Sequence, residues 1–269
     1  MVDNNRPIGI FDSGLGGLTV VKQIKKILPY EKIVYFGDTA RVPYGSKSSE
    51  TVIRYSLQIS QFLEDNGVKF IVVACNTSSS IALEELKLKC NVPVIGVVEP
   101  ACKKAVEVTK EGTIGVIGTI ATMNSDTYKL MLNNLKPDIK VIQKACPLFV
   151  PLIEEGLLNG AIVDSVIDYY LSSLKGKIDT LILGCTHYPL LKDSIKNYFD
   201  SKVIIIDSSI EVANEVYRIF KKINLLADHD KDLEIEDRFF VSDYPQKFEE
   251  IASFFMGQRL KNIEKVFLE

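Results

Sequence analysis

Two short segments decide the fold prediction: residues 71–77 read IVVACNT, and residues 181–187 read LILGCTH. Each segment is a run of apolar residues of strand length that ends in a cysteine and continues into polar residues. Apolar runs of this length are typical of buried strands in a parallel sheet. Counted from Cys75 to Cys185, the two segments lie 110 positions apart.

Three more pairs of strand-like segments recur at nearly the same offset. Residues 8–10 correspond to 114–116 at an offset of 106, 32–34 to 139–141 at 107, and 94–95 to 204–205 at 110. Four strands repeated in the same order indicate two related α/β halves. A single doubly wound sheet with evenly spaced strands is the alternative, and the matched strand-ending cysteines favour duplication.

Apolar runs alternate with longer amphipathic stretches throughout the chain. Strands are predicted over residues 7–11, 32–36, 70–75, 92–97, 113–117, 140–144, 180–184 and 203–206, and helices over 19–27, 49–66, 78–88, 126–134 and 161–174. The predicted fold class is α/β, with two duplicated, pseudo-symmetric, doubly wound parallel-sheet domains and the active site in the cleft between them.

The segment after residue 210 has no counterpart in the other half. It predicts a helix over 212–222, a polar loop over 228–237, a strand over 238–241, a helix over 246–256 and a short terminal strand. We expect this tail to return and pack on the first half. The predicted domains are therefore residues 1–97 plus 208–269, and residues 98–207.

The charge balance gives no sign of a nucleic-acid or membrane partner. The chain has 269 residues, of which 32 are basic and 35 acidic, so its formal net charge is −3. A nucleic-acid or anionic-membrane surface needs a basic patch, which this balance does not suggest. No apolar stretch near the N-terminus has the length of a signal peptide, and no run is long enough to span a bilayer. We expect a soluble, cytoplasmic protein.

The cysteine pattern predicts reduced thiols. Five cysteines, without a C-x-x-C pair and with only two histidines, fit neither a disulfide framework nor a zinc site. We therefore expect no metal site. Cys90, Cys102 and Cys146 are interpreted as buried apolar residues.

We predict a different role for Cys75 and Cys185, because each directly follows a buried strand and precedes a helix start. The N–H groups of a helix N-terminus stabilise a thiolate. Two such thiols, one from each half, would face each other across the interface. This arrangement suits the removal of a proton from one face of a carbon and delivery of a proton to the other face.

Other polar residues also follow strands, at the edge of a parallel sheet where ligands bind. Asp12 begins the glycine-rich stretch DSGLGG, which lacks the P-loop lysine and the dinucleotide spacing. Its carboxylate can hold an ammonium group or orient a catalytic partner. His187 lies two residues after Cys185, where an imidazolium would lower the pKa of the thiol. His229, in the polar loop, is expected to be solvated.

Hydrogen-bond donors dominate the remaining strand ends. Such donors suit substrate carboxylates, so a substrate with two carboxylates and one ammonium group fits the set. We expect Arg41 and Lys47 to lie on the surface. The candidate substrate-binding residues are Asp12, Ser13, Pro43, Tyr44, Gly45, Asn76, Thr77, Thr119, Thr122, Thr186 and His187.

The motifs DSGLGG, VPYG, ACNT, GTIATMNS and GCTHYP together resemble the glutamate racemases of the aspartate/glutamate racemase superfamily. The resemblance runs from Gly9 to the C-terminal strand. Aspartate racemases typically carry glutamate where this chain has His187, so the resemblance favours glutamate as the substrate.

The resemblance implies a two-base mechanism without pyridoxal phosphate or metal. Cys75 would take the α-proton from D-glutamate and Cys185 from L-glutamate. Asp12 and His187 match auxiliary catalytic residues of the family, and Glu154 matches a third. The resemblance also implies supply of D-glutamate for peptidoglycan, no cofactor and a homodimer.

Three alternatives remain open at this point. The first is a superfamily racemase or decarboxylase that acts on aspartate or another amino acid. The second is a non-catalytic solute-binding protein, since two α/β halves around a cleft also describe that architecture. The third is dithiol redox chemistry between Cys75 and Cys185.

Overall fold

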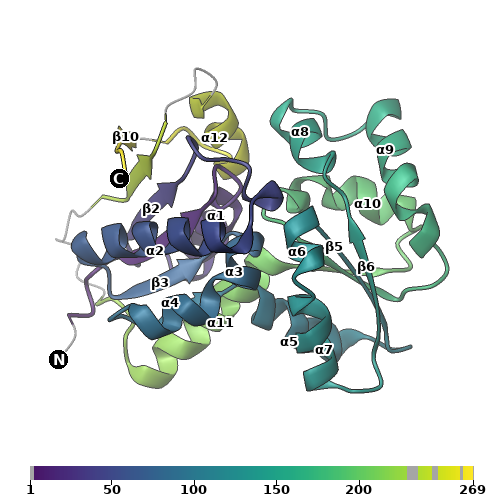
Figure 1. Cartoon of the computed structure of the whole chain (residues 1–269), viewed down its shortest axis with the longest axis horizontal. Coiled ribbons are helices and arrows are strands. Elements are labelled where there is room, and N and C mark those ends of the chain that lie inside the picture. The colour runs from purple at the N-terminus through teal and green to yellow at the C-terminus, as the bar shows by residue number, and fades with distance from the viewer. Residues whose placement is uncertain (1–2, 229–235, 244–247, 261–262, 269) are drawn as a thin grey trace.

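The computed structural model describes residues 3–228, 236–243, 248–260 and 263–268. They form two lobes side by side, each built on its own parallel β-sheet with helices packed against it (Figure 1). The prediction of two parallel-sheet α/β domains is confirmed. The domain boundaries remain a prediction.

All strand pairs within the two sheets are parallel. The first sheet has the order β10-β9-β2-β1-β3-β4, and the second has the order β6-β5-β7-β8. The strands are β1 (Ile8–Asp12), β2 (Ile33–Gly37), β3 (Phe70–Val73), β4 (Val94–Gly96), β5 (Thr113–Gly118), β6 (Lys140–Ala145), β7 (Thr180–Gly184), β8 (Ile204–Asp207), β9 (Arg238–Val241) and β10 (Ile263–Lys265).

The repeated segments of the sequence occupy equivalent places in the two sheets. The order β2-β1-β3-β4 in the first sheet matches β6-β5-β7-β8 in the second, pair by pair. The central strands β1 and β3 are fully buried, as expected where helices cover both faces of a parallel sheet. The internal repeat of the sequence is thus also a repeat of topology.

Most predicted helices are present, with shifted ends. The helices are α1 (Leu18–Ile27), α2 (Ser49–Asp65), α3 (Asn76–Ile81), α4 (Leu83–Lys89), α5 (Val98–Val108), α6 (Ile120–Asn124), α7 (Thr127–Leu135), α8 (Phe149–Glu154), α9 (Ala161–Leu171), α10 (Lys192–Tyr198), α11 (Ser208–Ile223) and α12 (Phe248–Met256). Short 3₁₀ turns are η1 (Tyr44–Ser46), η2 (Ser172–Leu174) and η3 (Tyr188–Leu191).

Two helix predictions need correction. The single helix expected over 78–88 is two helices, α3 and α4, which meet at Ala82. The helix expected from residue 212 begins earlier, at Ser208, because the Asp207 carboxylate accepts a hydrogen bond from the Ser209 N–H at 3.0 Å and caps it.

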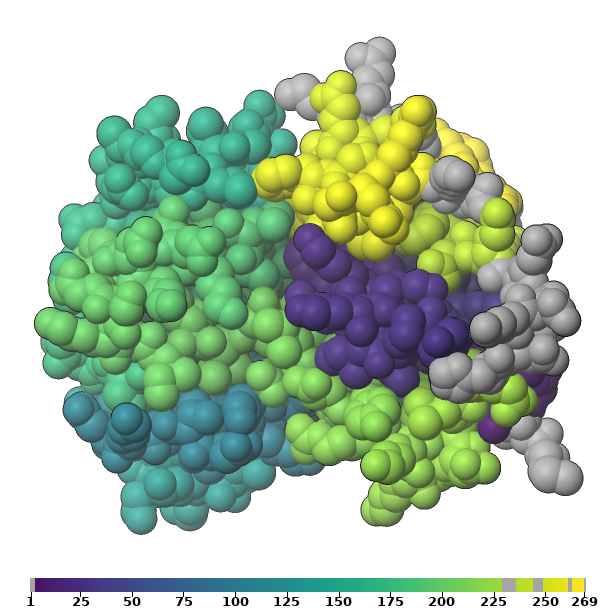
Figure 2. Space-filling model, turned by 180° about the vertical axis from the view of Figure 1, so that it is seen from behind, coloured from purple at the N-terminus to yellow at the C-terminus, as the bar shows by residue number. Residues whose placement is uncertain are grey.

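The tail returns to the first half, as predicted. Strand β9 pairs with β2, and α12 and α11 both pack on α1. Figure 2 shows α1, in dark purple, between the yellow C-terminal segment and the yellow-green α11. Helix α11 also packs on α5 of the second half, so it contacts both halves.

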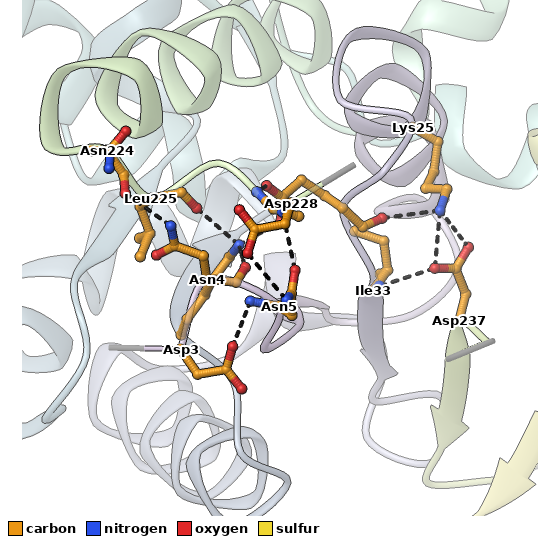
Figure 3. Close-up of polar contacts among 12 residues, drawn as sticks. Asp3, Asn4, Asn5, Lys25, Ile33, Asn224, Leu225, Asp228 and Asp237 are labelled. Carbon is orange, nitrogen blue, oxygen red and sulfur yellow. Dashed lines mark hydrogen bonds and ion pairs between the residues drawn. The ribbon is translucent and has the colours of Figure 1, made fainter. Parts of the chain in front are cut away.

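A polar network joins the N-terminal segment to the residues after α11, at the end of the first sheet where its strands begin. The side chain of Asn4 donates to the Asn224 carbonyl at 3.1 Å, and the Asp228 N–H donates to the Asn5 side chain at 3.0 Å (Figure 3). Beneath them, buried Lys69 pairs with buried Glu31 at 2.7 Å. These contacts join the first residues of the chain to the residues that follow α11.

The helices described here include none that could serve as a membrane span, because none is both long enough and apolar enough.

Candidate active site

The candidate residues gather where the strand ends of the two halves meet. The first half contributes the loop after β1, the turn η1 after β2 and the start of α3 after β3. The second half contributes the start of α6 after β5 and residues 185–187 after β7. Hydrogen bonds and close contacts join these segments across the interface.

Cys75 lies at the N-cap of α3 and is only 5% exposed. Its thiol donates to the Ser13 hydroxyl over 3.6 Å. Burial, with a smaller contribution from the Asp12 carboxylate, raises the pKa of Cys75 to about 11. A helix N-terminus by itself would lower this pKa, so burial outweighs it, and the thiol is protonated at neutral pH.

Cys185 lies directly after β7 and is 6% exposed. Its Sγ is 4.0 Å from Nδ1 of His187. The segment that follows is the 3₁₀ turn η3, which leads into α10, rather than an α-helix from the start. Cys75 and Cys185 thus each have a polar neighbour on their own side of the interface.

His187 links Cys185 to a carboxylate. Its Nε2 lies 3.0 Å from the Glu154 carboxylate at the end of α8. Burial alone would lower the pKa of His187, but the contacts with Cys185 and Glu154 outweigh burial and raise it to about 10. The Glu154 side chain is 44% exposed, so solvent screens part of its attraction. The imidazole is therefore positively charged at neutral pH.

Asp12 connects the two halves. One carboxylate oxygen accepts a hydrogen bond from the Thr186 hydroxyl at 3.4 Å, and the other accepts from the Gly14 N–H at 3.1 Å. Burial raises the pKa of Asp12, although the charge of His187 and the loop N–H groups oppose this rise. The carboxylate is 1% exposed and lies on the first-half side of the contact.

The glycine-rich loop after β1 has a packing role. A Cβ atom on Gly16 would lie 2.2 Å from the Thr186 hydroxyl oxygen and 2.4 Å from Nδ1 of His187. Only glycine allows the second half to approach the loop this closely. Thr19, which the sequence analysis did not single out, donates its hydroxyl to the carbonyls of Gly16 and Thr186, at 2.8 and 3.0 Å.

Three threonine hydroxyls form a second bridge between the halves. Thr77 from the first half lies 3.0 Å from Thr119 and 3.2 Å from Thr122, and those two are 2.9 Å apart. Next to them, Tyr128 donates its hydroxyl to the Asn76 side chain at 2.6 Å. No sequence pattern pointed to Tyr128, because it lies inside α7 and not at a strand end.

The turn that contains Tyr44 and Gly45 packs on the second half, since a Cβ on Gly45 would lie 2.7 Å from the Thr119 Cβ. Pro43 precedes the turn and is exposed. The Tyr44 hydroxyl donates to buried Asp38. Arg41 pairs with the same carboxylate at 2.7 Å, and its side chain is only 17% exposed.

The expectation that Arg41 lies on the surface is therefore wrong. Its guanidinium balances the buried charge of Asp38, a residue that the sequence analysis missed. Asp38 directly follows β2, so the same strand-end reasoning that found Asp12 could have found it. Lys47 is half-buried.

The other cysteines behave as buried apolar residues. Cys102 and Cys146 are 0% exposed and Cys90 is half-buried, and burial raises the pKa of each thiol. All five cysteines are free. His229 lies outside the described residues. Within those residues, no three or more His, Cys, Asp or Glu side chains cluster so that they could hold a metal ion.

Comparison with known proteins identifies the family of the chain. The family model described as Asp/Glu/Hydantoin racemase matches residues 8–216. A glutamate racemase from Geobacter metallireducens is 46% identical over 265 residues, covering 98% of this chain and 97% of the relative. One from Aquifex pyrophilus is 55% identical over 214 residues, covering 80% and 83%.

Solved structures give the same result. The crystal structure of glutamate racemase from Francisella tularensis in complex with D-glutamate has a TM-score of 0.93 and 42% identity, covering 99% of both chains. An aspartate racemase from Picrophilus torridus, at 18% identity and a TM-score of 0.59, shares the fold. By sequence and by structure, the chain belongs to the Asp/Glu/hydantoin racemase family and, within it, to the glutamate racemases.

Proposed function

We propose that this protein interconverts L-glutamate and D-glutamate by proton transfer at Cα, with Cys75 and Cys185 as the two bases. The observation that carries the proposal is the pair of strand-end thiols at one interface. Cys75 contacts Ser13, Cys185 contacts His187, and the Asp12–Thr186 hydrogen bond joins the two sides. Relatives that share 42–55% identity with this chain are glutamate racemases.

In the proposed reaction, the thiolate of one cysteine removes the α-proton and the thiol of the other protonates the opposite face. From D-glutamate, Cys75 is the base and Cys185 the acid, and from L-glutamate the roles are reversed. The raised pKa of Cys75 fits this role, because a thiolate that is costly to form is a stronger base towards a carbon acid. No atom is lost, and the two cysteines exchange protonation states at each turnover.

The surrounding groups would hold the substrate and tune the bases. The positively charged imidazole of His187, held by Glu154, lies beside the sulfur of Cys185. The Asp12 carboxylate is an acceptor for the substrate ammonium group. Donors for the two substrate carboxylates would come from Ser13, Asn76, Thr77, Thr119, Thr122, Thr186 and the Pro43–Tyr44–Gly45 turn.

The test is deuterium incorporation at Cα when the purified protein is incubated with L- or D-glutamate in heavy water without added cofactor. We expect exchange at Cα and conversion of each enantiomer to the racemate. Aspartate in a parallel reaction should exchange far more slowly. Glutamate binding without exchange would favour a solute-binding protein, and preference for aspartate would overturn the substrate assignment.

We also infer the cellular setting from this activity. D-Glutamate made by the enzyme would be used in peptidoglycan synthesis. We therefore expect the enzyme in the cytoplasm, where the precursors of peptidoglycan are made. Five free cysteines suit a reducing compartment. A homodimer is the expected assembly, and exposed apolar side chains on α9, Ile162 at 61% and Tyr169 at 72%, are available for such a contact. Sedimentation analysis would show the assembly directly.

A further inference from the structure

Asp38 is a buried carboxylate that the proposed proton transfer does not use. It directly follows β2, and its N–H donates to the Asp12 carbonyl at 3.1 Å. The residue is 0% exposed. Asp12 and Asp38 therefore leave neighbouring strands at the same edge of the sheet, and Asp12 is hydrogen-bonded to Thr186 of the second half.

Three donors satisfy the Asp38 carboxylate. Oδ2 accepts from the Tyr44 hydroxyl and from Nε of Arg41, the latter at 2.7 Å, and Oδ1 accepts from the Ser242 hydroxyl at 2.7 Å. Arg41 is fixed in turn by Gln58 at 2.7 Å, and its guanidinium lies 4.0 Å from the centre of the Tyr55 ring. The charge is balanced inside the network, so Asp38 orders its neighbours and is not an empty ligand site.

The consequence for Tyr44 is that its hydroxyl faces Asp38. The side chain is 1% exposed, and burial together with Asp38 raises the pKa of Tyr44 well above its ordinary value, so the phenol stays a donor. The ring of Tyr44 lies in the same buried cluster as Cys75, so the turn η1 is held next to one of the two proposed bases.

The position of this turn also affects the second half. Gly45 packs against Thr119, whose hydroxyl belongs to the cluster with Thr77 and Thr122. A shift of the turn by a few tenths of an ångström would change the space left for this cluster. Asp38 therefore affects the substrate-binding groups indirectly, through its hydrogen bond with Tyr44.

We propose that Asp38 is a positioning residue for glutamate binding, which holds Tyr44 by its hydroxyl and so sets the turn η1 against Thr119. The proposal rests on the proposed function, because it assigns the turn to substrate binding. It predicts that losing the Asp38–Tyr44 bond weakens binding of the substrate while the proton-transfer step stays nearly intact.

The first test is Tyr44→Phe, which removes the hydroxyl and keeps the ring. We expect KM for both glutamate enantiomers to rise about tenfold, the size expected for one hydrogen bond to a charged group, with kcat within about twofold of wild type. The matched control is Tyr198→Phe. Tyr198 also donates to an aspartate, Asp168 at 2.8 Å, but lies between α10 and α9 away from the site, so KM should not change.

The second test separates positioning from direct contact between Tyr44 and the substrate. Asp38→Asn replaces the charged acceptor of the Tyr44 hydroxyl with a weaker neutral one and should also raise KM. Asp38→Asn combined with Tyr44→Phe should be no worse than the more harmful single change, because both act on the same hydrogen bond. Additive effects, or a normal KM in Tyr44→Phe, would overturn the proposal. Should Asp38→Asn fail to fold in thermal unfolding, the comparison of Tyr44→Phe with Tyr198→Phe decides.

Measurements on the wild-type protein distinguish a failure of the proposed function from a failure of the proposed role of Asp38. If wild type does not exchange the α-proton of glutamate, the proposed function fails. If wild type racemises glutamate and Tyr44→Phe retains its KM, only the role of Asp38 fails.

Discussion

At the scale of single residues, the two buried thiols of the site have different neighbours. Cys75 has a hydroxyl partner and lies near the Asp12 carboxylate, which raises its pKa together with burial. Cys185 has a charged imidazole beside it. The two bases of the proposed reaction are thus equivalent in position in the repeat and unequal in their electrostatic environment.

Replacing either thiol by a hydroxyl tests the two-base proposal. We expect Cys75→Ser and Cys185→Ser each to lower kcat by roughly 10²–10⁴-fold, because a serine hydroxyl is a far weaker acid than a thiol. Racemisation followed by polarimetry measures the loss. Cys90→Ser serves as the control, since Cys90 is half-buried away from the interface and should leave kcat unchanged. Full activity in both site variants would rule out the two-base mechanism.

The ion pair between His187 and Glu154 should appear in a titration. The pKa of His187 lies at about 10, above the ordinary value of 6.5, so the charged form is favoured in the folded protein. Its stabilising contribution is complete below about pH 6.5 and is lost as the pH rises through about 10. We expect Glu154→Gln to lower this pKa, as measured by NMR of the imidazole.

The chain has only one other histidine, His229, so His229→Ala assigns the signal. An unchanged His187 titration in Glu154→Gln would mean that Glu154 does not contribute to the charge at this position.

At the scale of elements, the start of α1 determines how closely the halves approach. The glycine-rich loop ahead of α1 leaves room for Thr186 and His187, and Thr19 in the first turn bonds to the Thr186 carbonyl. Helix α1 is also held from behind by α11 and α12. The loop before α1 is therefore a contact surface between the halves.

A side chain at position 16 should push the two halves apart at the site. In Gly16→Ala the new Cβ would lie 2.2 Å from the Thr186 oxygen, so the loop or the second half must move. A displacement of about 1 Å can cost roughly 100-fold in rate, and we expect kcat/KM to fall by about that factor. Steady-state kinetics measures the loss, and far-UV circular dichroism should show an intact fold. Wild-type kinetics in this variant would show that the close contact is not needed.

At the scale of the whole molecule, a buried ion pair fixes the end of the first sheet opposite the site. Lys69 and Glu31 are 0% and 2% exposed and lie 2.7 Å apart. Lys69 also donates to the Asn4 and Leu225 carbonyls, and Glu31 accepts from the Ala227 N–H. Burial lowers the pKa of Lys69, so its charge depends on these partners.

Removing one partner of this pair should destabilise the fold without altering catalysis. Lys69→Met leaves Glu31 buried and unpaired, which costs roughly 3–5 kcal/mol in the free energy of unfolding. Denaturant unfolding measures the loss, and kcat at 25 °C should stay unchanged. Lys87→Met is the control. It removes a surface pair with Glu84, whose side chains are 40% and 82% exposed, and should cost under about 1 kcal/mol. Equal stability of the two variants would contradict the prediction.

Periodicity and repeats in the sequence were sufficient to predict the two parallel sheets, the strands within a few residues and the return of the tail. Short helices were harder: α8 and α10 are six and seven residues long, too short to show a helical period clearly. The strand-end rule also found the residues at the interface, because parallel strands place their carboxyl ends at one edge.

The sequence by itself therefore determined the architecture and the chemical groups, because strand length, apolar pattern and strand-end position are local properties of the chain. The tertiary structure alone decided which groups touch: Glu154 with His187, Thr19 with Thr186, and Asp38 with Tyr44 and Ser242. These partners are 6 to 204 positions apart in the chain, and their contacts depend on how two separately built halves and a returning tail pack together. The charge of His187 and the high pKa of Cys75 follow from that packing, since burial and neighbouring charges exist only once the chain has folded.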